Sequence, residues 1–126
     1  MEMPTLSDRI RSLRRLMEDK RLGWFLVADE ADMLYFTGFL GAARLLIPSQ
    51  EESILYVSGV NYEAARETAK NCQVELVKTG EDVDEKVAEQ IQRQRSKSLG
   101  FDNLNVSVFS KLKKHFKSVG LKPAGQ

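Results

Sequence analysis

The stretch that decides the fold is YFTGFLGAARLLIP, residues 35–48, in which two glycines precede an apolar run that contains one arginine. Gly38 and Gly41 bracket Phe39, and this spacing predicts a loop with unusual backbone dihedrals that presents an aromatic ring. The apolar residues after the loop predict a buried strand. Arg44 is the charged residue inside this predicted strand, so its surroundings are the question that the stretch raises.

The sequence leaves two interpretations of Arg44 open. In the first, the side chain alternates outward, its stem covers apolar surface, and its guanidinium reaches water or an acid such as Asp32. In the second, the guanidinium lies at a cleft and binds a carboxylate through two hydrogen bonds. The usual exposure of arginine side chains favours the first interpretation.

The segments around this stretch alternate between helical and extended patterns. Ser7 and Asp8 are capping candidates for a helix with apolar positions at helical spacing. Two apolar runs separated by the polar SQEE predict a hairpin, and therefore an antiparallel part of the sheet. The predicted elements of this half are a helix at 6–17, a strand at 24–28, a helical turn at 29–38, and strands at 42–48 and 53–57.

The second half continues the alternation. Asn61 is a capping candidate for a helix that would place Ala65, Ala69 and Cys72 on one face. A strand at 73–79, a helix from about Asp82, a strand at 98–102 and a last helix with Phe109, Leu112, Phe116 and Val119 on its stripe follow. We therefore expect residues 1–126 to form a single three-layer α/β domain with a mixed sheet flanked by helices.

Composition and charge narrow the function classes. Hydrophobic residues make up 42% and charged residues 29% of the 126 residues, as in ordinary globular domains. A net charge of +1 argues against a general polyanion binder. The N-terminus lacks the apolar core of a signal peptide, and no run has membrane-spanning length. The single cysteine, Cys72, excludes an internal disulfide and fits a reducing compartment, so a soluble cytoplasmic domain without a membrane partner is predicted.

Two basic clusters raise the question of nucleic-acid binding. They lie largely between the apolar stripe positions of the first and last predicted helices, as on a solvated face, and no aromatic stacking pattern accompanies them. We therefore expect no nucleic-acid partner. The clusters are Arg9, Arg11, Arg14 and Arg15, and Lys111, Lys113, Lys114 and Lys117.

Metal and thiol chemistry find little support in the sequence. The only histidine, His115, stands among lysines without a second ligand at suitable spacing, and Cys72 ends an apolar stripe. A nuclease-like alternative would use the acids Asp29, Asp32 and Asp102, which follow predicted strands and would have to share a metal. Acids at such positions usually cap turns and helices, and the sequence therefore favours a chain without its own metal site.

Several short motifs in a fixed order resemble a known family. ADMLYFTGF at 31–39 precedes an apolar hairpin, LYVSGVNYEAA at 55–65 leads from a strand into a helix, and SLGFDNLNVSVFSKLKK at 98–114 joins a strand, an acid and a closing helix. GWFLVAD at 23–29 fits the start of the same pattern. Together they resemble the N-terminal domain of the creatinase, prolidase and Xaa-Pro aminopeptidase group over essentially the whole chain.

The resemblance implies a mixed sheet flanked by helices, similar to a ribonuclease H arrangement. In full-length members a pita-bread domain follows, where two aspartates, one histidine and two glutamates hold two divalent ions, commonly manganese, cobalt or zinc. These ions activate the water that attacks the bond before proline. None of these ligands has a match in this sequence, so the resemblance implies that the catalytic pita-bread domain is absent and that this chain alone is not an enzyme and holds no cofactor.

Within that family the N-terminal domain contributes to dimer or tetramer contacts and walls the entrance of the active site. The resemblance thus implies a homo-oligomer, commonly a dimer, whose main partner is the catalytic domain, and it points to Tyr35, Phe39 and Arg44 as residues that approach a substrate or an interface. An alternative is a stand-alone module that binds small molecules or peptides on the same fold. That alternative predicts ligand binding that Arg44→Ala weakens.

Overall fold

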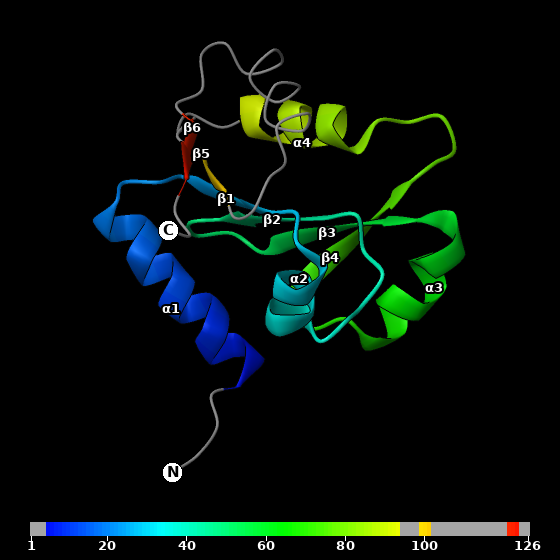
Figure 1. Cartoon of the computed structure of the whole chain (residues 1–126), viewed down its shortest axis with the longest axis horizontal. Coiled ribbons are helices and arrows are strands. Elements are labelled where there is room, and N and C mark those ends of the chain that lie inside the picture. Colours follow the sequence, from blue (N-terminus) through cyan, green and yellow to red (C-terminus); the bar gives the residue numbers. More distant parts are fainter. Residues whose placement is uncertain (1–4, 94–98, 102–120, 124–126) are drawn as a thin grey trace.

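A computed structural model describes residues 5–93, 99–101 and 121–123, in which helices cover both faces of a six-stranded sheet (Figure 1). The strand order is β4-β3-β2-β1-β5-β6. Helices α1, α2 and α3 lie on one face and α4 on the other (Figure 1). The elements are α1 (Leu6–Asp19), β1 (Trp24–Val27), α2 (Glu30–Thr37), β2 (Arg44–Pro48), β3 (Ser53–Ser58), α3 (Gly59–Thr68), β4 (Cys72–Val77), α4 (Val83–Gln92), β5 (Leu99–Phe101) and β6 (Leu121–Pro123).

The sheet is mixed, which confirms the predicted fold class. Strand β2 pairs antiparallel with β1 and β3, whereas the β3–β4, β1–β5 and β5–β6 pairs are parallel. The ends of all strands except β2 therefore share one edge of the sheet with the start of β2. We call this the carboxyl edge and the opposite side the amino edge. The predicted hairpin of β2 and β3 is confirmed.

Each face of the sheet packs a separate apolar cluster, as continuous apolar strands require. On the face that carries α1, α2 and α3, Val27, Leu45 and Val57 are fully buried. The face that carries α4 buries an aromatic-rich cluster, in which the side chains of three strands meet one helix. Its members are Trp24, Leu26, Leu46, Tyr56, Val87, Ala88 and Ile91.

Helix boundaries differ from the sequence-based expectation at three places. Helix α3 begins after its N-cap Ser58, so the predicted cap Asn61 lies inside the helix. Thr5 caps α1 instead of Ser7 or Asp8: its hydroxyl accepts from the Asp8 backbone, and the Asp8 carboxylate accepts from the Thr5 backbone. Helix α3 ends at Thr68, so Cys72 opens β4 instead of closing a helical stripe.

The backbone between α3 and β4 explains why Cys72 is not helical. The C-cap Ala69 is already extended, and Asn71 adopts a left-handed backbone with φ of 61°, so the helix does not resume before β4. Cys72 then pairs with Ser53 at the start of the parallel β3–β4 ladder. The last predicted helix, around residues 109–119, lies outside the described residues. Within the described part, no helix has the length and apolarity needed to cross a membrane.

Candidate functional site

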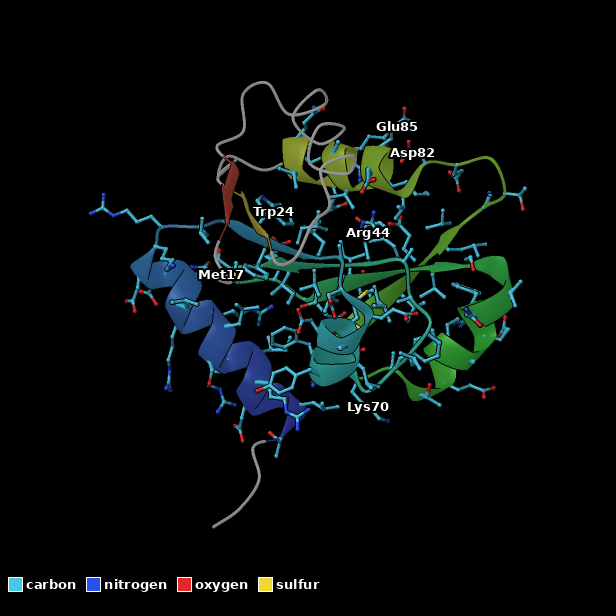
Figure 2. The ribbon with its side chains drawn as sticks, in the orientation of Figure 1. Met17, Trp24, Arg44, Lys70, Asp82 and Glu85 are labelled. Atoms are coloured by element: carbon cyan, nitrogen blue, oxygen red, sulfur yellow. The ribbon has the colours of Figure 1, made fainter. Side chains whose placement is uncertain are left out.

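The three residues that the sequence singled out lie on consecutive segments between the end of β1 and the start of β2. Tyr35 belongs to α2, Phe39 to the loop after it, and Arg44 opens β2. Figure 2 shows Arg44 on the face of the sheet that carries α4, on the side of the labelled Asp82 and Glu85. The three side chains therefore have different surroundings, which decide what each can do.

Arg44 forms an internal ion pair. Its Nε donates to Oδ1 of Asp84 at 3.2 Å, and its Nη1 donates to the carbonyl oxygen of Ala43 at 2.7 Å. The Arg44 side chain is 17% exposed and that of Asp84 only 5%. The guanidinium thus finds an acid, as the first interpretation expected, but the acid is Asp84 on α4 and not Asp32. An external carboxylate at this position would have to displace Asp84.

The loop of residues 38–43 has the unusual dihedrals that its glycines predicted. The φ values of Gly38 and Gly41 are 76° and 115°. The Thr37 hydroxyl accepts from the Phe39 backbone at 3.2 Å, and Nδ2 of Asn61 donates to the Gly41 carbonyl oxygen at 3.0 Å. The loop is therefore fastened to α2 at its start and to α3 at its centre.

Gly41→Ala is expected to lower the free energy of unfolding by about 1–2 kcal/mol. An L side chain is strained at a φ of 115°, and the added Cβ would lie 3.1 Å from Nδ2 of Asn61. Urea titration of the variant measures this loss. Gly59→Ala serves as the matched control, because a Cβ there meets only Leu76 at 4.0 Å. An equal loss in both variants would contradict the assignment of strain to Gly41.

Phe39 is buried in the core, whereas Tyr35 lies at the surface. Phe39 is 8% exposed and joins the cluster under α1, α2 and α3, so the loop buries this ring instead of presenting it. Tyr35 is 48% exposed. The guanidinium carbon of Arg9 lies 4.3 Å from the centre of the Tyr35 ring, and Nη1 of Arg9 donates to the Tyr35 carbonyl oxygen at 2.7 Å. Of the three predicted residues, Tyr35 is the one that offers a large apolar surface to a partner.

Three further apolar side chains on this connection and at the start of α3 are exposed, and the sequence-based interpretation missed them. Leu34 on α2 is 42% exposed, Leu40 in the loop 59%, and Val60 at the start of α3 94%. Leu40 and Val60 each adjoin one partner of the Gly41–Asn61 hydrogen bond, which brings loop and helix together. Their sequence signal was slight: Leu40 directly precedes Gly41, Val60 directly follows Gly59, and both fall outside the apolar stripes.

The first acid after β1, Asp29, caps a helix and forms no metal site with its neighbours among the described residues. Oδ1 of Asp29 accepts from the backbone nitrogens of Ala31 at 2.8 Å and Asp32 at 3.2 Å, which caps α2. Across the residues that the structure describes, no group of three or more His, Cys, Asp or Glu side chains could hold a metal ion. Asp102 of the nuclease-like alternative and His115 lie outside those residues.

Cys72 is expected to react slowly with alkylating agents. Burial raises the pKa of its thiol to about 11, and the Glu52 carboxylate adds to the shift. The thiolate, which is the reactive form, is therefore about a hundredfold rarer near pH 8 than in a thiol with the ordinary value of 9.0. Iodoacetamide labelling followed by mass spectrometry, with urea-unfolded chain as the control, measures the difference. Equal rates in the two states would contradict it.

Comparison with known proteins gives a consistent set of matches. Residues 9–126 match the family model described as the creatinase/prolidase N-terminal domain. A search among curated proteins finds no match. A solved Xaa-Pro aminopeptidase structure from Streptococcus pyogenes is similar with a TM-score of 0.85 at 23% identity, covering 95% of this chain and 92% of that one. A proline dipeptidase structure from Streptococcus pneumoniae TIGR4 gives 0.79 at 20%, covering 91% and 90%.

One similar structure comes from a much longer chain. The Xaa-Pro dipeptidase from Bacillus anthracis is similar with a TM-score of 0.82 at 22% identity, covering 96% of this chain but only 34% of that one. At these identities the structural likeness shows a shared fold. The chain corresponds in length to about a third of that dipeptidase.

Proposed function

Because the chain belongs to the creatinase/prolidase N-terminal domain family, we propose that it acts as the non-catalytic N-terminal domain of a metal-dependent Xaa-Pro peptidase-like protein. The observation that carries the proposal is the family match over residues 9–126, together with a counterpart that fills about a third of a dipeptidase. In this proposal the metal ions and the hydrolytic chemistry belong to a catalytic domain of the parent. The described residues of this chain offer no donor group that fits two metal ions.

We further propose that exposed apolar side chains on the β1–β2 connection and at the start of α3 supply contacts to a partner subunit or to the rim of the catalytic site. The exposed apolar residues of α2, the loop and the start of α3 support this role, since apolar anchors supply most of the energy of protein contacts. These residues are Leu34, Tyr35, Leu40 and Val60. Arg44 contributes indirectly, because its bond to Asp84 fixes the start of β2 beneath α4.

The proposed role is tested in the parent peptidase with the variants Tyr35→Ala and Leu40→Ser. If these side chains line the substrate entrance, KM for Xaa-Pro peptides should rise several-fold while kcat stays near the parent value, because contacts away from the reacting bond contribute mainly to binding. If they form a subunit contact, sedimentation velocity should show a smaller assembly instead.

Leu16→Ser is the matched control for this experiment. Leu16 lies on α1 and is 38% exposed, so the substitution removes an exposed apolar side chain that is not one of the proposed contact residues. The proposal fails if Tyr35→Ala and Leu40→Ser leave both KM and the sedimentation coefficient unchanged, or if Leu16→Ser changes them equally. Hydrolysis of Xaa-Pro dipeptides by the 126-residue chain itself, assayed with Mn²⁺, would contradict its non-catalytic role.

A further inference from the structure

The amino edge of the sheet carries a hollowed surface that the proposed function does not use. Two open hollows of about 370 and 470 Å³ lie between α1 and the β2–β3 turn. Both are lined by Arg11, Arg14 and Gln50, so they meet along one side of α1. The larger has a volume in the range of small-molecule sites.

Helix α1 supplies the charge of the larger hollow. Arg11, Arg14, Arg15 and Glu18 follow the spacing of one helical face and all line it, and Arg21 joins them after the helix end. The lining thus contains four arginines and one glutamate. The smaller hollow differs, because Glu51 and Glu52 line it and offset Arg11 and Arg14. Only the larger hollow has a strong excess of positive charge.

Arg14 is the fixed centre of this group. Its Nε donates to the Pro48 carbonyl oxygen at 3.1 Å, and its Nη2 donates to the Glu51 carbonyl oxygen. These two bonds hold the guanidinium against the β2–β3 turn, and its half-buried charge has no carboxylate partner among the described residues. Burial lowers the pKa of the Arg14 guanidinium, because the charged form is partly removed from water. A partly desolvated cation without a counter-ion is stabilised by any anion that reaches it.

We propose that the larger hollow binds a small, multiply charged oxyanion carrying phosphate or carboxylate groups. The guanidinium group of Arg14 is already held in place, so less free energy is spent on ordering this side chain when an anion binds. The neighbouring Arg15 adds a second set of hydrogen-bond donors. The charge of Arg11 is partly compensated by Asp8, whose Oδ1 lies 3.1 Å from Nη1 of Arg11. Guanidinium groups suit phosphate and carboxylate oxygens alike, so the two ligand types are distinguished by experiment.

The probes are pyrophosphate and citrate, added to the 126-residue chain at constant ionic strength set with NaCl. Calorimetry is expected to show one site with a dissociation constant below about 1 mM. A probe concentration about one hundredfold above this dissociation constant should raise the Tm of the chain by about 4 °C or more. Tighter binding of pyrophosphate would identify a phosphate compound as the ligand, and tighter binding of citrate a polycarboxylate. NaCl alone should produce neither effect.

Arg15→Gln is the decisive variant, because Arg15 is exposed and contacts no carboxylate among the described residues, so its loss leaves the fold intact. It should weaken anion binding about tenfold. Arg66→Gln, which removes an exposed arginine of α3 that stacks on Tyr62 instead, should change affinity less than twofold. The proposal is overturned if neither probe binds more tightly than chloride at equal ionic strength, or if both variants weaken binding equally.

Discussion

Asp84→Ala is expected to lower the free energy of unfolding by about 3 kcal/mol. The substitution leaves the Arg44 guanidinium, whose side chain is 17% exposed, without its carboxylate partner. A buried charge that loses its partner costs far more than the net value of the pair, because it stays out of water. Urea unfolding followed by the fluorescence of Trp24, the single tryptophan, measures the loss.

Two comparisons separate the ion pair from other effects at the start of α4. Glu85→Ala removes an exposed acid one residue further along and should cost less than about 0.5 kcal/mol. The double variant Arg44→Met/Asp84→Leu should recover most of the lost stability, since an apolar pair of similar size replaces two desolvated charges. A double variant no more stable than Asp84→Ala would show that the loss comes from packing and not from the unpaired guanidinium.

The partner of Arg44 illustrates what the sequence alone could predict. Burial of the strand and the need of Arg44 for an acid follow from the apolar run and from the cost of an unpaired charge. The choice of acid depends on which face of the sheet the side chain points to. Asp32 is near in sequence but lies in α2, on the opposite face from α4 (Figure 1). Asp84 is forty residues away but lies in the first turn of α4, on the face to which Arg44 points.

Phe39 shows a similar limit. Gly38 and Gly41 predicted a loop with positive φ correctly, because glycine alone adopts such angles without strain. They did not predict the direction of the ring between them, which depends on the cluster under α1, α2 and α3. Burial of Phe39 leaves Tyr35, Leu40 and Val60 as exposed apolar side chains, and a partner would use this exposed surface.

Trp24→Ala is expected to lower the free energy of unfolding by about 4 kcal/mol. Trp24 is 2% exposed at the start of β1 and belongs to the cluster with Val87 and Ile91 of α4. Because the variant lacks the fluorescent side chain, far-UV circular dichroism must follow its urea unfolding. Leu16→Ala, at a position 38% exposed, should cost less than about 1 kcal/mol and is the matched control.

Trp24 and Asp84 contribute contacts at opposite ends of α4. Combining Trp24→Ala with Asp84→Ala therefore tests whether the two ends of the helix are stabilised independently. Helix α4 follows β4 and precedes β5, so it begins at the carboxyl edge, where Arg44 binds Asp84, and ends toward the amino edge, where Trp24 opens β1. Sites that share no partner contribute independently, so the losses of Trp24→Ala and Asp84→Ala should add within about 0.5 kcal/mol. A combined loss well below the sum would mean that releasing one end of α4 already frees the other, and that the helix is held as a single unit.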